Sequence, residues 1–106
     1  MKPNMNNAMK QVQKAQAEMA RVQEELASDL VTASAGGGMV KVSMTGALSV
    51  TAVVIDPRAV DPDDVEMLQD MVAAAVNEAV REAQDLGSKK MSRIMGGLGL
   101  PGGMGF

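Results

Sequence analysis

Apolar side chains recur at intervals of three and four residues between Asn4 and Ala27. The positions are Met5, Ala8, Val12, Ala15, Met19, Val22 and Leu26. This spacing is typical of a long α-helix with one narrow apolar face. At the rise of an α-helix, these 24 residues span about 36 Å.

The pattern then changes to a strict alternation of apolar and polar residues. Between Met39 and Thr45 one face carries Val40, Val42 and Met44, and the other carries Lys41, Ser43 and Thr45. A period of two predicts a β-strand with one face in a core and the other in water.

Two more segments favour strands. They are Leu30 to Ala35, with a weak signal, and Leu48 to Ile55, which is rich in valine. Turns at Gly36–Gly38 and Gly46–Ala47 separate the three segments, so we expect an antiparallel meander. Its longest strand spans roughly 26 Å, and the first helix is therefore predicted to extend past the sheet.

The three glycines at positions 36 to 38 do not favour a nucleotide site. A glycine loop that binds phosphate leads into a helix, whose N-terminal N–H groups converge on the anion. Here a strand follows. The glycines therefore predict a tight turn.

A second helix is predicted after the sheet. Asp56 and Pro57 end the third strand, Asp61 is expected to be the N-cap, and Pro62 is expected at the first helical position. The apolar face of this helix comprises Val65, Leu68, Val72, Val76, Ala79, Ala83 and Leu86. Gly87 is expected to end it.

The middle of this helix is apolar on nearly all sides, which predicts contact with the sheet on one side and with a second copy on the other. The candidate interface residues are Met67, Met71, Ala74, Ala75 and Val80. Ser88 to Met95 predicts a further short basic helix, and the glycine-rich segment from Gly96 to Phe106 predicts a disordered tail. The expected fold is thus α+β, in the order α-β-β-β-α-α, with one domain over residues 1–95.

The composition limits the possible functions. The only aromatic residue is Phe106, and there is no cysteine or histidine. A core without aromatic side chains is thin, so we expect an oligomer. Without histidine the commonest general base and metal ligand is missing, and we expect neither an enzyme nor a cofactor. No apolar run is long enough to span a membrane and no signal peptide is recognisable, which favours a cytoplasmic location.

An acidic cluster follows the sheet and could suggest a metal site. Its members are Asp61, Asp63, Asp64 and Glu66. The cluster lacks the pattern of a calcium loop, and helix capping explains each of these residues. Methionines at helical spacing are likewise better explained by core packing than by a soft metal. We expect no metal and no small-molecule substrate.

Charge is distributed unevenly along the chain, whose net charge is −3. Residues 1–17 and 88–106 each carry three basic residues and no acidic ones, whereas residues 56–85 carry nine acidic residues and two arginines. DNA affinity depends on local neutralisation of phosphates, so an acidic protein binds DNA if its basic parts project. The alternative is that these lysines only solvate helix faces.

Several motifs in order resemble the YbaB/EbfC family of bacterial nucleoid-associated proteins. They are Ala35 to Val42 (AGGGMVKV), Val54 to Pro57 (VIDP), Asp61 to Leu68 (DPDDVEML) and Ala73 to Asn77 (AAAVN). The resemblance covers nearly the whole chain. It implies a homodimer whose long helices project from a central sheet layer and bind DNA with little sequence preference. Carried over to this chain, the implied DNA contacts are Lys10, Lys14, Arg21, Lys89, Lys90 and Arg93.

The leading hypothesis is a non-enzymatic homodimer that binds double-stranded DNA in the nucleoid through backbone phosphates. The alternative is a protein-interaction module whose first helix docks a helix of a partner, with incidental DNA contact. An enzyme that uses carboxylates and lysines has no constellation to support it.

Overall fold

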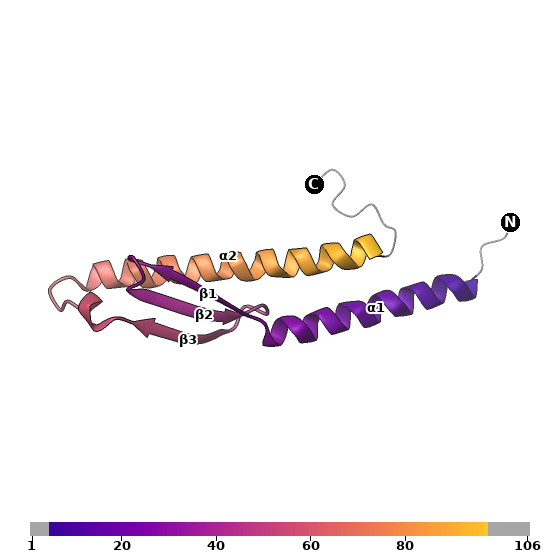
Figure 1. The fold of residues 1–106 in the computed structure, drawn as a ribbon, viewed down its shortest axis with the longest axis horizontal. Helices are drawn as coiled ribbons and strands as arrows, with labels where there is room; N and C mark the ends of the chain where they lie inside the picture. The colour runs from indigo at the N-terminus through magenta and orange to yellow at the C-terminus, as the bar shows by residue number, and fades with distance from the viewer. Residues whose placement is uncertain (1–4, 98–106) are drawn as a thin grey trace.

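The computed structural model describes residues 5–97. The order of elements is α1 (Met5–Ser28), β1 (Leu30–Ala35), β2 (Val40–Thr45), β3 (Val50–Ile55), the 3₁₀ turn η1 (Pro57–Ala59) and α2 (Val65–Gly97). Helix α2 lies along one face of the sheet and continues beyond it beside α1, which runs in the opposite direction (Figure 1). The predicted α+β class and the order from α1 to α2 are confirmed.

The three strands form the expected antiparallel meander in the order β1-β2-β3. The alternation predicted for β2 is confirmed, since Val40, Val42 and Met44 are buried. The turn before β2 holds Gly36, Gly37 and Gly38 at positive φ, a conformation that glycine adopts without steric cost. The glycines therefore shape a hairpin turn, as the sequence predicts.

The main core lies between α2 and the first two strands. Ala75, Ala79 and Ala83 are fully buried and recur once per helical turn. They face Ala33, Val40, Val42 and Met44 of the sheet. Because alanine side chains are short, the helix backbone approaches the sheet closely, and β3 is left beyond the reach of α2.

A second, smaller core joins the two helices. We call it the helix junction: Val22 and Leu26 of α1 pack with Ile94 of α2, and Leu86 and Met91 flank them. The junction requires α2 to remain helical through Gly87, where a Cβ atom would lie 3.8 Å from Leu26 Cδ1. The predicted break at Gly87 is therefore wrong, and the expected second and third helices are one continuous helix.

The ends of α2 also differ from the sequence prediction. Asp64, not Asp61, caps the helix, since its Oδ1 accepts a hydrogen bond from the Met67 N–H at 3.2 Å. Asp61 instead accepts from the Asp63 N–H at 2.9 Å in the preceding turn. At the other end α2 includes Gly96 and Gly97, where the sequence predicts the start of the tail. Residues 98–106 of that expected tail lie outside the described residues.

The first half of α1 projects from the body of the protein, as predicted (Figure 1). Every residue from Met5 to Lys14 is exposed. The radius of gyration is 20.0 Å, against about 13 Å for a compact chain of this length. We call residues 5–17 the arm. Across residues 5–97, neither helix combines the length and apolar character that crossing a bilayer requires.

Two glycines beside Leu26 give opposite predictions for replacement by alanine. Gly46→Ala places a Cβ atom 2.7 Å from Leu26 Cδ2 and 2.9 Å from the Leu26 carbonyl oxygen, and should lower the free energy of unfolding by about 1–3 kcal/mol. Gly87→Ala lies inside α2 without a clash and should raise it by about 0.5–1 kcal/mol. Urea unfolding followed by circular dichroism measures both, and a destabilised Gly87→Ala variant would contradict the continuous helix.

Candidate nucleic-acid interface

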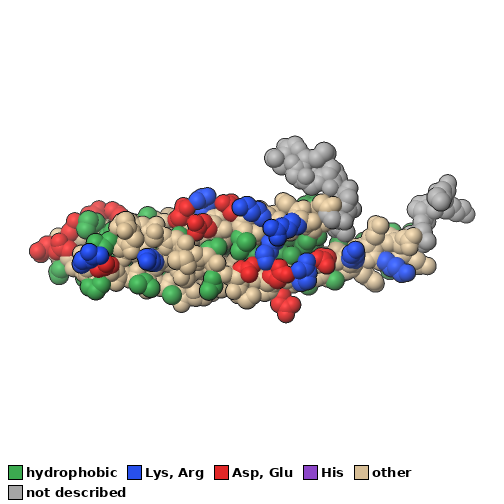
Figure 2. All heavy atoms as spheres, viewed as in Figure 1, with side chains coloured by type: hydrophobic (Ala, Val, Ile, Leu, Met, Phe, Trp, Pro, Cys, Tyr) green, Lys and Arg blue, Asp and Glu red, His purple; other side chains and the backbone are tan. Residues whose placement is uncertain are grey.

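Four of the six predicted DNA contacts are free cations. Lys10 and Lys14 lie on the arm, and Lys89 and Arg93 lie in the last turns of α2. All four are exposed, and none makes a hydrogen bond or ion pair with the residues that the structure describes. In Figure 2 basic side chains lie along the half of the molecule from which α1 projects, mixed with acidic ones near the middle, whereas acidic side chains predominate at the opposite tip.

Arg21 is engaged within its own helix. Its guanidinium donates to Glu18 Oε2 at 2.6 Å and to Glu25 Oε1 at 2.5 Å. The hydrogen bond to Glu18, together with both negative charges, raises the pKa of Arg21 further above its ordinary value. These carboxylates compete with phosphate for the guanidinium, so Arg21 offers DNA less charge than its residue type suggests.

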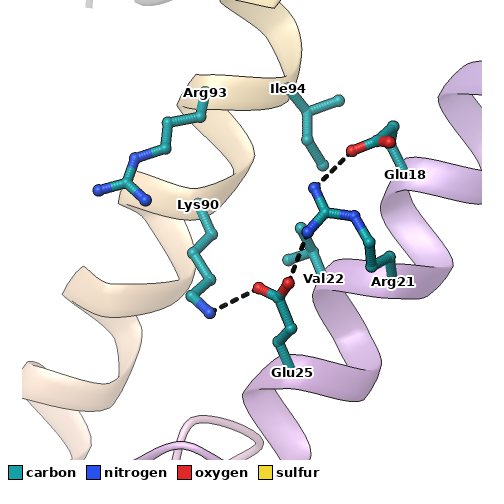
Figure 3. A pocket seen from close by; sticks show the side chains of 7 residues that line it. All are labelled: Glu18, Arg21, Val22, Glu25, Lys90, Arg93 and Ile94. Atoms are coloured by element: carbon teal, nitrogen blue, oxygen red, sulfur yellow. Dashed lines mark hydrogen bonds and ion pairs between the residues drawn. The ribbon is translucent and has the colours of Figure 1, made fainter.

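Lys90 is more strongly engaged, because it bridges two elements. Its Nζ lies 2.8 Å from Glu25 Oε2 and 2.6 Å from Asp29 Oδ2, and only 16% of the side chain is exposed. Hydrogen bonding to Asp29 and Glu25 raises the pKa of Lys90. We call these two ion pairs the Lys90 bridge. Figure 3 shows Lys90 directed at Glu25, while Arg93 points away from α1.

A shallow hollow lies between the helices at this bridge. It is lined by Glu18, Arg21, Val22, Glu25, Lys90, Arg93 and Ile94 (Figure 3). Two carboxylates face it, and both are already paired with cations. The hollow therefore does not suit a phosphate group. Of the four free cations, Arg93 lines this hollow, whereas Lys10, Lys14 and Lys89 do not.

The five residues expected at a dimer interface do not share one surface. Met67 and Ala74 are exposed, whereas Met71 and Val80 are half-buried and pack on the main core. Ala75 is fully buried between α2 and the sheet. The prediction for Ala75 is corrected, because a partner cannot reach a side chain that its own sheet already covers.

An exposed apolar surface on β3 escaped the sequence analysis. Every residue of β3 is exposed, including Val50, Val53, Val54 and Ile55. The signal was the unbroken run from Val53 to Ile55, because such a run is typical of a strand covered on both faces. Helix α2 covers β1 and β2 only, so β3 retains both an open edge and apolar faces.

Two members of the acidic cluster before α2 bind backbone N–H groups, Asp64 at the N-cap of the helix and Asp61 in the preceding turn. Asp61 and Asp64 both accept hydrogen bonds from backbone N–H groups two or three residues further on. Within residues 5–97 there is no group of three or more histidine, cysteine or acidic side chains arranged to hold a metal ion.

These features define a class: an α+β protein in which a helix pair extends from a small sheet and presents free cations. The chain belongs to the YbaB/EbfC DNA-binding family, whose sequence model matches residues 1–98. It is 52% identical to a nucleoid-associated protein of Alkaliphilus metalliredigens over 94% of this chain and 88% of that protein. It is 54% identical to one of Pelotomaculum thermopropionicum, over 93% of this chain and 94% of that protein.

The fold is also similar to a known crystal structure, that of an uncharacterized protein from Helicobacter pylori. The TM-score is 0.74 over 89% of this chain and 98% of that chain, at 21% sequence identity. This similarity confirms the fold of a helix, three antiparallel strands and a long helix.

The Lys90 bridge predicts a pH-dependent contribution to stability. Hydrogen bonding to Lys90 lowers the pKa of Glu25 below its ordinary value of 4.5. The stabilisation is therefore present above that value and is lost as the pH falls through the lowered pKa. Glu25→Gln should lower the free energy of unfolding near neutral pH, and the deficit should shrink as the pH falls below 4.5.

Urea unfolding of the wild type and Glu25→Gln at several pH values measures this deficit. Glu24→Gln is the matched control, because Glu24 is exposed and outside the bridge. A deficit that stays constant from neutral to acid pH would contradict the assignment.

Proposed function

We propose that this chain is a homodimer that binds double-stranded DNA with little sequence preference, through backbone phosphates. The observation that carries the proposal is the set of four unpaired cations, Lys10, Lys14, Lys89 and Arg93, at the projecting end of a family member. Phosphate contacts position a protein on DNA without reading its sequence. The relatives named nucleoid-associated proteins support a location on the bacterial nucleoid.

The distribution of charge supports electrostatic binding despite the net charge of −3. The acidic residues between Asp56 and Asp70 lie at or beyond the end of the sheet from which α2 starts, far from the arm (Figures 1 and 2). Because screening limits surface charges to about 10 Å at moderate salt, the arm experiences its own lysines more than this distant acidic tip. Few contacts imply weak affinity, on the order of micromolar, with strong salt sensitivity.

The surface of β3 supports the homodimer. An exposed apolar edge strand is a liability that proteins cover or pair, and β3 exposes four large aliphatic side chains. A second copy that covers β3 would also supply the layer that the thin core lacks. Dimerisation doubles the number of free cations available to one duplex.

A protein-interaction module is the second candidate, and the arm supplies the observation that favours it. Met5, Met9 and Val12 are more than half exposed and line a shallow apolar hollow with Ala8. A helix of a partner could pack on this face. Stoichiometric capture of a partner, combined with loss of DNA binding near physiological salt, would favour this alternative.

Lys14→Ala tests the phosphate contacts. Each contact contributes ~0.9 to the slope of log affinity against log salt, so losing one in each protomer should reduce the slope by about 2. Fluorescence anisotropy with a random-sequence duplex measures it. Lys41→Ala removes the same charge from an exposed site on β2 and should leave the slope unchanged. Equal effects of the two variants would contradict the site.

Val53→Asp tests the dimer. Light scattering of the wild type should give about 22 kDa, twice the chain mass of 11.0 kDa. Burying an unpaired carboxylate is costly, so Val53→Asp should shift the protein toward the monomer. Val60→Asp is the control, since Val60 is similarly exposed but lies outside β3. A dimer unaffected by Val53→Asp would place the interface elsewhere.

A further inference from the structure

We propose that Lys90 is a positioning residue for DNA binding: it fastens α1 to α2 and thereby holds the lysines of the arm in place relative to Lys89 and Arg93. The inference rests on the proposed function. It gives Lys90 a different role from the phosphate contact implied by family resemblance, and it makes Glu25 and Asp29 part of the binding machinery although both are acidic.

The Lys90 bridge joins three parts of the chain at one point. Glu25 lies in the last turn of α1, and Asp29 connects α1 to β1. The Asp29 backbone is itself fixed, because its N–H donates to the Glu25 carbonyl at 2.8 Å and its carbonyl accepts from the Gly46 N–H at 3.0 Å. A single ammonium group therefore ties α2 to α1 and to the start of the sheet.

Asp29 depends on this ammonium. Its Oδ2 atom is buried and makes no hydrogen bond to any other group among the described residues. A buried charged oxygen without a partner is strongly unfavourable. Loss of Lys90 should therefore make the Asp29 carboxylate, whose side chain is already 35% exposed, turn outward to water. The tie between α2 and the end of α1 is then lost.

Little else holds α1 against α2. Among residues 5–97, the helix junction fully buries three side chains, Val22, Leu26 and Ile94, and Ile94 lies about one turn from Lys90 on α2. Every residue of the arm from Ala8 to Lys14 is exposed. The direction of the arm is thus set by the junction and the Lys90 bridge together.

The arm amplifies any change at the bridge. Lys10 is 15 residues from Glu25, or about 22 Å along the helix. A tilt of about 10° at the bridge would then move Lys10 by about 4 Å, more than the length of a hydrogen bond. Without the bridge the arm has to be ordered again when DNA binds, which weakens binding although each ammonium group still reaches a phosphate in the complex.

The Asp29→Asn variant distinguishes a phosphate contact from a positioning role for Lys90, because the two roles predict opposite changes in DNA affinity. If Lys90 contacts phosphate, Asp29→Asn removes one of the two carboxylates that compete for its ammonium and makes the protein less negative, so DNA affinity should rise and the salt slope should not fall. If Lys90 positions the arm, Asp29→Asn should weaken binding, by about fivefold, without a steeper slope. Glu24→Gln removes the same charge from an exposed site on α1 and should not weaken binding.

Neighbouring lysines provide the second matched pair. Lys89→Met removes a free cation and should reduce the salt slope by about 2 in a dimer. Lys90→Met keeps the aliphatic stem in the junction but loses the bridge, so it should weaken binding with an unchanged slope. Circular dichroism and urea unfolding of each variant establish that α2 and the sheet remain folded.

The position of the arm is measured directly by electron spin resonance distances. The chain has no cysteine, so Gln11→Cys and Ser92→Cys place one spin label on the arm and one on α2. Dilution with excess unlabelled protein leaves one labelled chain in each dimer. We expect a narrow distance distribution for the wild type and Lys89→Met, and a broader or shifted one for Lys90→Met and Asp29→Asn.

The outcomes separate this inference from the proposed function. Tighter DNA binding by Asp29→Asn, a reduced slope for Lys90→Met, or distances unchanged in both variants would each overturn the positioning role. Absence of DNA binding by the wild type would instead overturn the proposed function, and the distance comparison would still decide whether the bridge holds the arm.

Discussion

The close packing of the α2 alanines on the sheet is the constraint on which the other features depend. Ala75, Ala79 and Ala83 fix the direction of α2 across β1 and β2, and α2 is long enough to continue past the sheet. The continuing turns provide the surface on which Val22 and Leu26 pack. One helix thus builds the sheet core and the support for the arm, and it leaves β3 uncovered because it lies over the other two strands.

The sequence predicted an element well where the apolar face within that segment alone determines its structure. The bounds of β1, the alternation in β2 and the length of α1 follow from residues within each segment. Gly87 misled the prediction because its local preference for a helix end is overridden by the packing of Ile94, further along α2, on Val22 and Leu26 of α1, which are distant in sequence. Ala75 misled it because an apolar residue on a widely apolar helix does not reveal which side the sheet covers.

The cations of the candidate site could be located from the sequence, but their roles could not, because these depend on contacts between different elements. A sequence shows where cations occur but not which of them carboxylates already neutralise. Lys89 and Lys90 are adjacent in sequence, yet a rotation of about 100° between successive helical positions leaves Lys89 exposed and directs Lys90 at Glu25 and Asp29. The partners of Lys90 come from another element, so only the tertiary structure separates a free charge from a structural one.

Binding of the wild-type dimer to a random-sequence duplex across a salt series tests the central claim most directly. We expect log affinity to fall linearly with log salt, with a slope no steeper than about −7, since the four free cations described at the projecting end of each chain give eight per dimer at ~0.9 each. A dimer of confirmed mass that fails to bind even at low salt, or whose affinity does not depend on salt, would contradict a function based on phosphate contacts.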